Sequence, residues 1–382
     1  QPSRPYAKTV CELNFLPRVM VDSLRLKLGS YFYANEILDH FNVLGGAAMN
    51  AARDLDIFTM VEYRKLPPTL FFEFYYFTRN VKRDIAVIEH YPVKVPIDVH
   101  FRIVEGNIGG YYNLTESQKL RASLVHSRST SDIGDFYFKP QRIQFRSPAN
   151  TYFIGNHLRL QWSLDQRAPG RNSRINPTAG REVTVQVSHE WNKFFTGYST
   201  QDENIALQKE YTHYNVNKLE LDWHEFVKMP WSRSHALNLL FRGGYMDRPV
   251  DSFFNFFAGG LPGLRGYPYY AIEGRKMTVG RATYRLPIFS GWQKQLLHLT
   301  TDKLFASAFF EMGNAFDEDR IDFAAMKRSC GAGLRAQLFS FYGFPTAIAV
   351  DAAYGMDRFT HRDKPYGGEW RYYVTLLFDF ID

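Results

Sequence analysis

One arginine in a long aromatic segment is the residue of this sequence best placed to do chemistry. Residues 247–275 are rich in glycine and proline, and within their centre, 256–267, Arg265 is the one charged residue. Surface loops are usually polar, so a segment of this composition is expected to pack inside the protein. A buried guanidinium without a partner is costly. We therefore expect Arg265 to form a buried ion pair that locks the segment in place.

Glu311 is the acid that the sequence offers as this partner. In the segment 304–316, one face carries Phe305, Ser307, Phe309, Glu311 and Gly313, and the other face is apolar. Successive residues of a strand point to opposite faces, so Glu311 is predicted to face the interior with Phe309 beside it. It is the only acid on this strand. Gly313 is expected to leave space for the incoming segment.

Other reactive side chains do not form a recognisable site. His189 and His224 are each followed by glutamate but lack the second histidine of a zinc-binding helix, and no GxSxG or phosphate-binding loop motif occurs. Cys11 and Cys330 lie far apart without CxxC spacing, and Cys330 is expected to face lipid. The charge of +7 is spread along the chain, which argues against a nucleic-acid partner. We predict no enzyme activity, no cofactor and no metal.

The elements that must position Arg265 and Glu311 are strands with one apolar face. In residues 369–380 the apolar face has aromatic residues at both ends and aliphatic residues between them. This pattern is typical of a strand that crosses a bilayer with both ends in the headgroup region. Similar alternation recurs along the chain, no run of 18 apolar residues exists, and the mean hydropathy is slightly polar although 16% of residues are aromatic. A soluble β-rich protein would share this composition, but strands of about ten residues favour a membrane barrel.

The sequence thus predicts an all-β, transmembrane, antiparallel β-barrel of sixteen strands over residues 26–382, with residues 247–275 inserted into its lumen. Residues 1–25 contain Pro5 and Pro17 and are expected to be a periplasmic leader or linker, and the absence of a signal-peptide pattern predicts a mature or trimmed chain. The connection around 323–327 has room for a short helix. The expected strands are 26–36, 39–52, 55–66, 68–79, 96–108, 116–129, 135–146, 156–169, 179–195, 213–229, 232–246, 276–289, 304–316, 328–341, 345–356 and 369–380.

Two motifs resemble those of the superfamily of barrel-assembly insertases and two-partner-secretion transporters. The run Gly263-Leu264-Arg265-Gly266-Tyr267 is similar to its (Val/Leu)-Arg-Gly-(Phe/Tyr) motif, and 309–313 is similar to its Phe-x-(Asp/Glu)-x-Gly strand motif. The resemblance covers residues 253–382. It implies that the motif lies in the sixth extracellular loop, before the last five strands, and that Arg265 and Glu311 are the lumen-facing arginine and its acid.

The sequence departs from this family at two points. Thr283 stands where some members carry a second acid for the arginine, so Glu311 is predicted to be the only acidic partner. The POTRA repeats of the family have no counterpart in residues 1–25. Delivery of a substrate is therefore expected to depend on a removed domain, a partner subunit or a different mechanism.

The resemblance implies an outer-membrane protein that assembles, inserts or translocates proteins through a lumen loop and a lateral seam. The seam is predicted between a first strand near 26–33, weakened by Gly29, and the last strand, which carries Trp370, Val374, Phe378 and Phe380. Expected partners are the lipid bilayer and lipopolysaccharide, client outer-membrane proteins and periplasmic accessory subunits. Two alternatives stay open: a passive pore or structural barrel that anchors a partner, and a barrel that anchors an upstream periplasmic or enzymatic domain.

Overall fold

The computed structural model describes residues 13–22, 25–36, 38–87, 94–133, 136–138, 143–145, 150–169, 176–200, 207–232, 234–291, 293–297, 299–340 and 344–378. These residues are predominantly strands, and the only helices among them are two single 3-10 turns, η1 (Ser252–Phe254) and η2 (Tyr269–Ala271). None of the helices in this part of the chain has the length and apolar character needed to cross a membrane.

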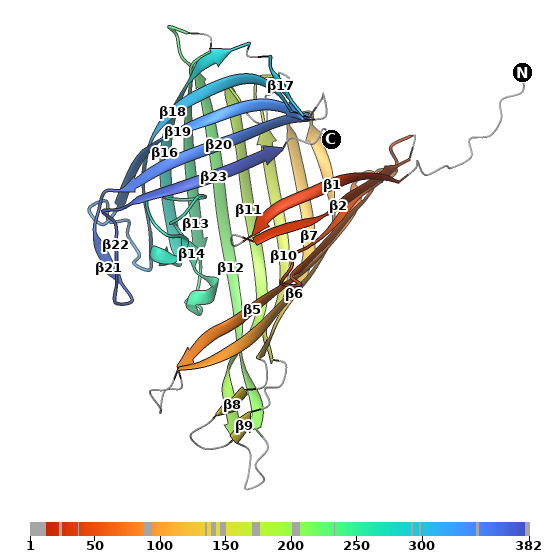
Figure 1. The fold of residues 1–382 in the computed structure, drawn as a ribbon, viewed down its shortest axis with the longest axis vertical. Helices are drawn as coiled ribbons and strands as arrows, with labels where there is room; N and C mark the ends of the chain where they lie inside the picture. Colours follow the sequence, from red (N-terminus) through yellow and green to blue (C-terminus); the bar gives the residue numbers. More distant parts are fainter. Residues whose placement is uncertain are drawn as a thin grey trace, which may run out of the picture. The chain divides into compact units, whose positions relative to one another are not determined.

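The strands alternate in direction along the chain (Figure 1). They are β1 (Asn14–Asp22), β2 (Arg25–Asn35), β3 (Phe41–Met49), β4 (Leu55–Tyr63), β5 (Thr69–Val87), β6 (Lys94–Thr115), β7 (Gln118–Ile133), β8 (Phe136–Phe138), β9 (Ile143–Phe145), β10 (Asn150–Asp165), β11 (Gly180–Thr200), β12 (Leu207–Lys228), β13 (Ala236–Met246), β14 (Phe256–Phe257), β15 (Glu273–Gly274), β16 (Lys276–Ser290), β17 (Gln295–Leu296), β18 (Leu299–Phe316), β19 (Lys327–Ser340), β20 (Phe344–Gly355), β21 (Phe359–His361), β22 (Lys364–Tyr366) and β23 (Trp370–Phe378).

Two compact units share these strands. The first comprises Gln1–Asn113, Leu120–Leu160 and Ser188–Asn215, and the second comprises Leu114–Lys119, Gln161–Val187 and Val216–Asp382. In the first unit, β1 to β6 pair consecutively and antiparallel. In the second, the antiparallel order is β12, β13, β16, β18, β19, β20 and β23.

The predicted all-β antiparallel architecture of sixteen strands is confirmed. The described strands of the main sheet number 17, and one of them, β17, is only two residues long. One expected strand was nevertheless wrong, and one strand was missed. Within the strand expected at 135–146, residues 136–138 and 143–145 form a separate antiparallel pair, β8 with β9, because local alternation does not specify which sheet a strand joins. The missing strand is β1, within residues expected to be a leader.

Pro17 explains why β1 escaped the sequence analysis. Proline lacks the backbone N–H that a ladder needs, so it normally argues against a strand. Here Pro17 lies opposite Ser30 in the β1–β2 ladder. Among the described strands of the first unit, β1 pairs along one edge, with β2. Edge strands tolerate proline because one side of their backbone need not be bonded.

The discovery of β1 corrects the predicted seam. Gly29 lies in β2, opposite Arg18 of β1 and Ala48 of β3, so it belongs to a strand that is paired on both edges. The segment 26–33 is therefore not the first strand.

The helix expected at 323–327 is also absent. Residues 322–326 form turns, with Ala325 N donating to Asp322 O, and β19 begins at Lys327.

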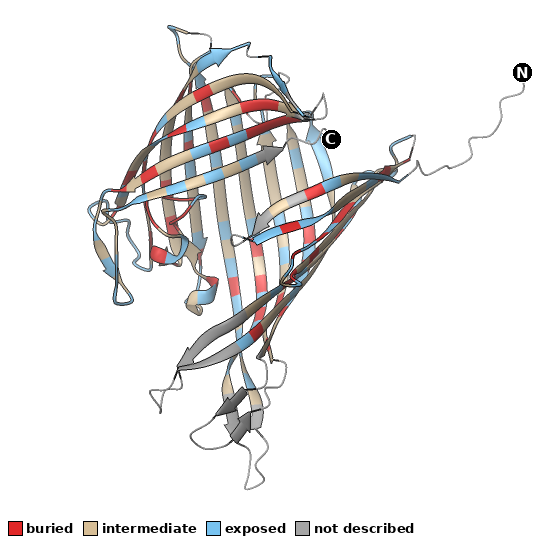
Figure 2. Ribbon diagram, viewed as in Figure 1, coloured by how far each residue is buried: buried red, intermediate tan, exposed pale blue. Residues whose placement is uncertain are grey.

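The strands of the second unit have two chemically different faces. Along β18, Phe305, Phe309 and Glu311 are buried, whereas the intervening Phe310 and Met312 are exposed. Buried and exposed stretches also follow one another along β19 and β20 (Figure 2). We call the face that carries Glu311 the inner face, because the loop 247–275 folds onto it. The opposite, apolar face has the chemistry that lipid requires.

A charge placed on the apolar face should destabilise the protein in a bilayer. Leu334 lies at the middle of β19, exposed and opposite Ala306 and Val350. We expect Leu334→Arg to lower the free energy of unfolding in lipid vesicles by about 2–4 kcal/mol, measured by denaturant titration. Leu297→Arg, in the exposed connection between β17 and β18, is the matched control and should change it little. Equal effects of the two substitutions would contradict the assignment of the lipid-facing side.

Candidate functional site

The loop 247–275 has a buried core of its own. Ala258, Leu264 and Tyr267 are fully buried and pack with Val279 of β16 and Ala315 of β18. Backbone hydrogen bonds inside the loop, such as Leu264 N to Ala258 O, hold its central turn together. The aromatic and glycine-rich composition is thereby explained, since the loop is packed against the inner face of the sheet.

The predicted ion pair between Arg265 and Glu311 is present. Arg265 Nε donates to Glu311 Oε1 at 2.7 Å, and the backbone N of Arg265 donates to Oε2 of the same carboxylate at 2.7 Å. The Glu311 side chain is fully buried and that of Arg265 nearly so. Charge-assisted bonds between such groups are among the strongest in proteins. Glu311 therefore fixes both the side chain and the backbone of the motif.

A second carboxylate, missed by the sequence analysis, completes the pair. Arg265 Nη1 lies 3.1 Å from Oδ2 of Asp351 on β20. The expectation that Glu311 is the only acidic partner was therefore wrong. Asp351 is the one charged residue of β20, and the residue alternation places it on the inner face. The reasoning that identified Glu311 as the inward acid of β18 would have identified Asp351 if it had also been applied to β20.

Thr283, the position considered for a second acid, lies on the same inner face. It is opposite Asn238 of β13 and Phe309 of β18. The inward residue next to it on β16, Arg281, is the one in register with Glu311. The second acid is thus supplied by another strand, and an acid at 283 is not needed to neutralise Arg265.

Arg281 balances the charges of the site. Its Nε lies 2.7 Å from Glu311 Oε1, an ion contact without the alignment of a directed hydrogen bond. Arg265 and Arg281 together oppose Glu311 and Asp351, two positive against two negative groups. Such compensation is required because an unpaired charge in a buried site costs several kcal/mol. We call these four residues the loop lock.

Each of the five long strands after the loop contributes to the lock or its immediate contacts. Arg281 comes from β16, Glu311 from β18 and Asp351 from β20. Ser329 of β19 donates its hydroxyl to Glu311 Oε2 at 2.5 Å. Tyr373 of β23 donates its hydroxyl to the carbonyl of Arg265 at 2.8 Å. The loop can therefore dock fully only on a sheet whose last five long strands are paired in register.

Close packing around the motif accounts for Phe309 and the glycines. The guanidinium carbon of Arg265 lies 3.4 Å from the centroid of the Phe309 ring, a cation–π contact. A Cβ on Gly266 would lie 2.6 Å from Gly355 N, so the loop could not approach β20. Gly313 has a different role from the one predicted. A Cβ there would lie 2.6 Å from Thr278 O, so it allows close approach to β16 rather than space for the loop.

Tyr267 anchors the other side of the motif. Its hydroxyl lies 2.9 Å from the carbonyl of Arg328 and 3.0 Å from that of Asp357, and it accepts a bond from Asp357 N at 2.9 Å. Burial raises the pKa of Tyr267 to about 12, which keeps the phenol neutral. Hydrogen bonds from Arg328 lower the pKa of Asp357. The anchor therefore joins the loop to the ends of β19 and β20.

Two strand arginines also hold the backbone of the loop. Arg242 of β13 donates to Pro262 O at 2.9 Å, and Arg281 donates to Gly263 O at 2.5 Å. Arg242 is in turn paired with Asp222 of β12 at 2.5 Å. Three consecutive strands of the inner face, β12, β13 and β16, are thus connected to the turn that precedes Arg265.

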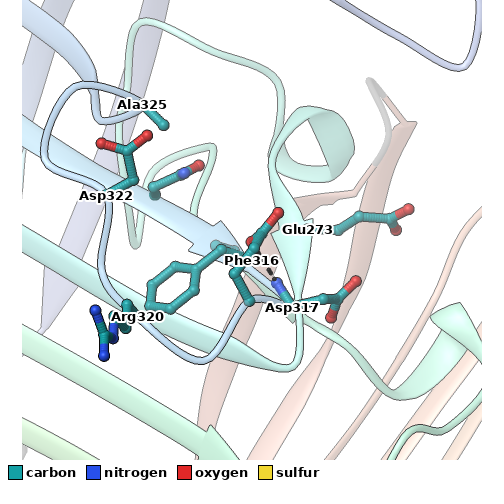
Figure 3. A pocket seen from close by; sticks show the side chains of 9 residues that line it. Glu273, Phe316, Asp317, Arg320, Asp322 and Ala325 are labelled. Atoms are coloured by element: carbon teal, nitrogen blue, oxygen red, sulfur yellow. Dashed lines mark hydrogen bonds between the residues drawn. The ribbon is translucent and has the colours of Figure 1, made fainter.

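A cavity of about 280 Å³ lies near the loop, where β18 ends (Figure 3). Two of the acidic side chains that line it are already in ion pairs. Glu273 is paired with His361 and Arg362, and Asp317 with Arg275. Among the described residues, no group of three or more His, Cys, Asp and Glu side chains is arranged to hold a metal ion. We assign this cavity to the packing of the connecting segments.

The residues predicted for the seam are only partly described. Trp370 and Val374 lie on β23 with exposed side chains. Phe378 ends this strand, its side chain is outside the described residues, and Phe380 lies beyond them entirely. In its own unit β23 pairs with β20, with Val374 opposite Val350. The role of these residues as a seam stays a prediction.

Comparison with known structures identifies the fold. No protein-family model and no curated protein sequence matches the chain. BamA from Haemophilus ducreyi lacking POTRA domains 1–3 matches with a TM-score of 0.60 and 11% identity, over 98% of this chain and 71% of that chain. CdiB from Escherichia coli matches with a TM-score of 0.56 and 10% identity, over 98% and 63%. CdiB from Acinetobacter baumannii gives 0.52 and 10%, over 97% and 65%.

The chain therefore has the fold of bacterial outer-membrane barrels of the BamA and CdiB kind, and it spans less than two thirds of either CdiB chain. The resemblance inferred from the loop and strand motifs is confirmed at the level of the fold. The outer-membrane location stays a prediction, which this fold supports.

Loss of either partner in the loop lock should release the loop. We expect Arg265→Ala and Glu311→Ala each to cost about 3–5 kcal/mol, because each leaves buried charge without compensation. The double variant should be little worse than Glu311→Ala, since residues that share an interaction are not additive. The measurements are the free energy of unfolding in vesicles and the rate of tryptic cleavage within 247–275.

Arg275→Ala is the control, because Arg275 lies on the same loop but in a partly exposed pair with Asp317. It should cost less than about 1 kcal/mol. Additive losses would show that Arg265 and Glu311 act separately.

The hydroxyl of Tyr267 should contribute independently of the ion pairs. Tyr267→Phe keeps the buried ring but leaves the backbone groups of Arg328 and Asp357 without their partner, at a cost of about 1–3 kcal/mol. Tyr270→Phe is the control, because that side chain is exposed at the loop surface. Denaturant titration of both variants provides the test. A loss no larger for Tyr267→Phe than for Tyr270→Phe would contradict the anchoring role.

Proposed function

We propose that this chain is an outer-membrane barrel that assembles, inserts or translocates proteins, using the inward-folded loop and a lateral seam between its first and last strands. The observation that carries the proposal is the loop lock, in which Arg265 is buried between Glu311 and Asp351. Its fold, that of BamA and CdiB barrels, supports the same class of function.

The lock joins the loop to the last strands of the sheet. Inward-folded loops also occur in passive barrels, so the proposal rests on which strands the lock holds. A barrel that must open along its wall needs an internal support for the strands near the opening. Because the lock extends to β23 through the bond from Tyr373 to Arg265, it can stabilise the last strand while the opposite edge of that strand changes partner.

Pro17 weakens the proposed closing pair at β1. It lacks a backbone donor, so a strand paired with β1 can lose a hydrogen bond near mid-length and is released more easily. An exposed strand edge is a template for adding another strand, and β-augmentation supplies affinity through main-chain hydrogen bonds. We infer that a client strand pairs transiently at the seam. Client barrels, lipid with lipopolysaccharide on the apolar face, and periplasmic subunits are the partners that this mechanism would involve.

A tether across the seam tests the proposal. In a chain with Cys11→Ser and Cys330→Ser, cysteines are introduced in pairs, one at Phe15 or Pro17 and the other at Tyr372 or Val374. We expect a disulfide between β1 and β23 to abolish catalysed assembly of a small eight-stranded client barrel into vesicles. Assembly is measured by the heat-dependent gel mobility of the client.

A tether inside the sheet is the matched control. Val350→Cys with Val374→Cys joins β20 to β23 at residues that are already opposite each other, so it leaves the seam free. This variant should retain client assembly. If the seam-tethered barrel stays equally active, the seam mechanism is wrong, and the role of passive pore or anchor replaces it.

A further inference from the structure

A second connecting segment of the chain also contacts the inner face, through residues just before β11. Residues 166–179 connect β10 to β11, and within them Asn176 and Pro177 are buried. Asn176 Nδ2 donates to Gln337 Oε1 of β19 at 2.7 Å. Its Oδ1 accepts bonds from Arg285 Nη1 of β16 at 3.0 Å and from Arg335 Nη1 of β19 at 3.2 Å. We call this arrangement the Asn176 clasp.

The clasp is close to the loop lock but differs from it in charge. Arg281 of the lock and Arg285 of the clasp lie four residues apart on the same face of β16, about 13 Å along a strand. Arg265 in the lock contacts two carboxylates. Both acceptors of Arg285, by contrast, are neutral: the Asn176 amide oxygen and, at 2.5 Å, the Pro177 carbonyl.

Two guanidinium groups that converge on one oxygen are better suited to a carboxylate than to an amide. Hydrogen bonds between ionised partners are roughly twice as strong as neutral ones, and the planar guanidinium matches the geometry of a carboxylate. Arg285 is buried and lies 5.7 Å from the centroid of the Phe305 ring, so its charge is poorly solvated. Arg335 also interacts with the charge of Asp351. The preference for an anion therefore rests chiefly on Arg285.

We propose that Arg285 and Arg335 form a carboxylate-binding site inside the barrel, with Asn176 as its displaceable neutral occupant. A carboxylate of an incoming polypeptide would replace the Asn176 amide and release Asn176 and Pro177 from the inner face. The choice of a polypeptide as ligand rests on the proposed function. The site itself rests on the contacts of Arg285, Arg335 and Asn176.

Binding of a model peptide tests the site directly. The probe is a pentaglycine peptide labelled at its N-terminus with the uncharged dansyl group and ending in a free carboxylate. It is compared with the same peptide ending in an amide, on the refolded full chain in detergent micelles. Fluorescence anisotropy should show binding of the carboxylate form and about tenfold weaker binding of the amide form, the loss expected for one charged hydrogen bond.

Two substitutions at one position should act in opposite directions. Asn176→Ala removes the occupant and should strengthen binding of the carboxylate peptide by several-fold, since the segment no longer competes for the arginines. Asn176→Asp fills the site with the chain's own carboxylate and should weaken binding by about tenfold or more. Arg285→Gln should weaken it to the level of the amide peptide. Heat-dependent gel mobility checks that each variant is folded.

Asn238→Ala is the matched control, because Asn238 lies on the inner face of β13, opposite Thr283 rather than Arg285. It should bind the peptide as the unmodified chain does. The proposal is overturned if the two Asn176 variants change affinity in the same direction, or if the amide and carboxylate peptides bind equally. None of these measurements involves client assembly, so their outcome is independent of the test at the seam.

Discussion

The buried guanidinium of Arg265 is the constraint to which the C-terminal half of the molecule is adapted. A charge removed from water at this position is tolerated only when carboxylates compensate it and hydrogen bonds satisfy the remaining groups. Glu311 and Asp351 provide the opposite charges, and Ser329 and Arg281 complete the contacts of Glu311. Partial docking would leave some of these buried charges without their partners. The fully docked position of the loop is therefore favoured over partly docked ones.

This constraint explains why the loop stands before the last five long strands. The groups that receive it come from β16, β18, β19, β20 and β23, so no smaller part of the sheet supplies the whole site. A shift of one residue in any of these strands would turn its inner residue to the apolar face. The docked loop therefore depends on correct pairing of the strands that follow it, and it stabilises that pairing in return.

Much of this could be predicted from the sequence, because the period of two assigns a face to each residue once a strand is recognised. The positions of Arg265 and Glu311 followed from composition, alternation and a family motif. Asp351 could not follow from the motif, which pointed to Thr283. Only the rule that an inward charge needs compensation would have revealed it.

The strand β1 was missed because a proline such as Pro17 generally argues against a ladder, whereas an edge strand can accommodate it. The hairpin of β8 and β9 was misassigned because alternation carries no information about strand partners.

The inner face thus holds two inserted segments by two kinds of chemistry, and the difference sets how readily each can leave. Carboxylates neutralise the arginines of the loop lock, so removing the loop would separate buried opposite charges. The Asn176 clasp joins arginines to neutral oxygens, so its release breaks hydrogen bonds but separates no ion pair. Net hydrogen bonds to a charged group contribute about 1.5–3 kcal/mol each, and an incoming carboxylate can replace them without separating opposite charges. Segments with similar burial on the same strands can therefore differ widely in how easily they are exchanged for an incoming chain.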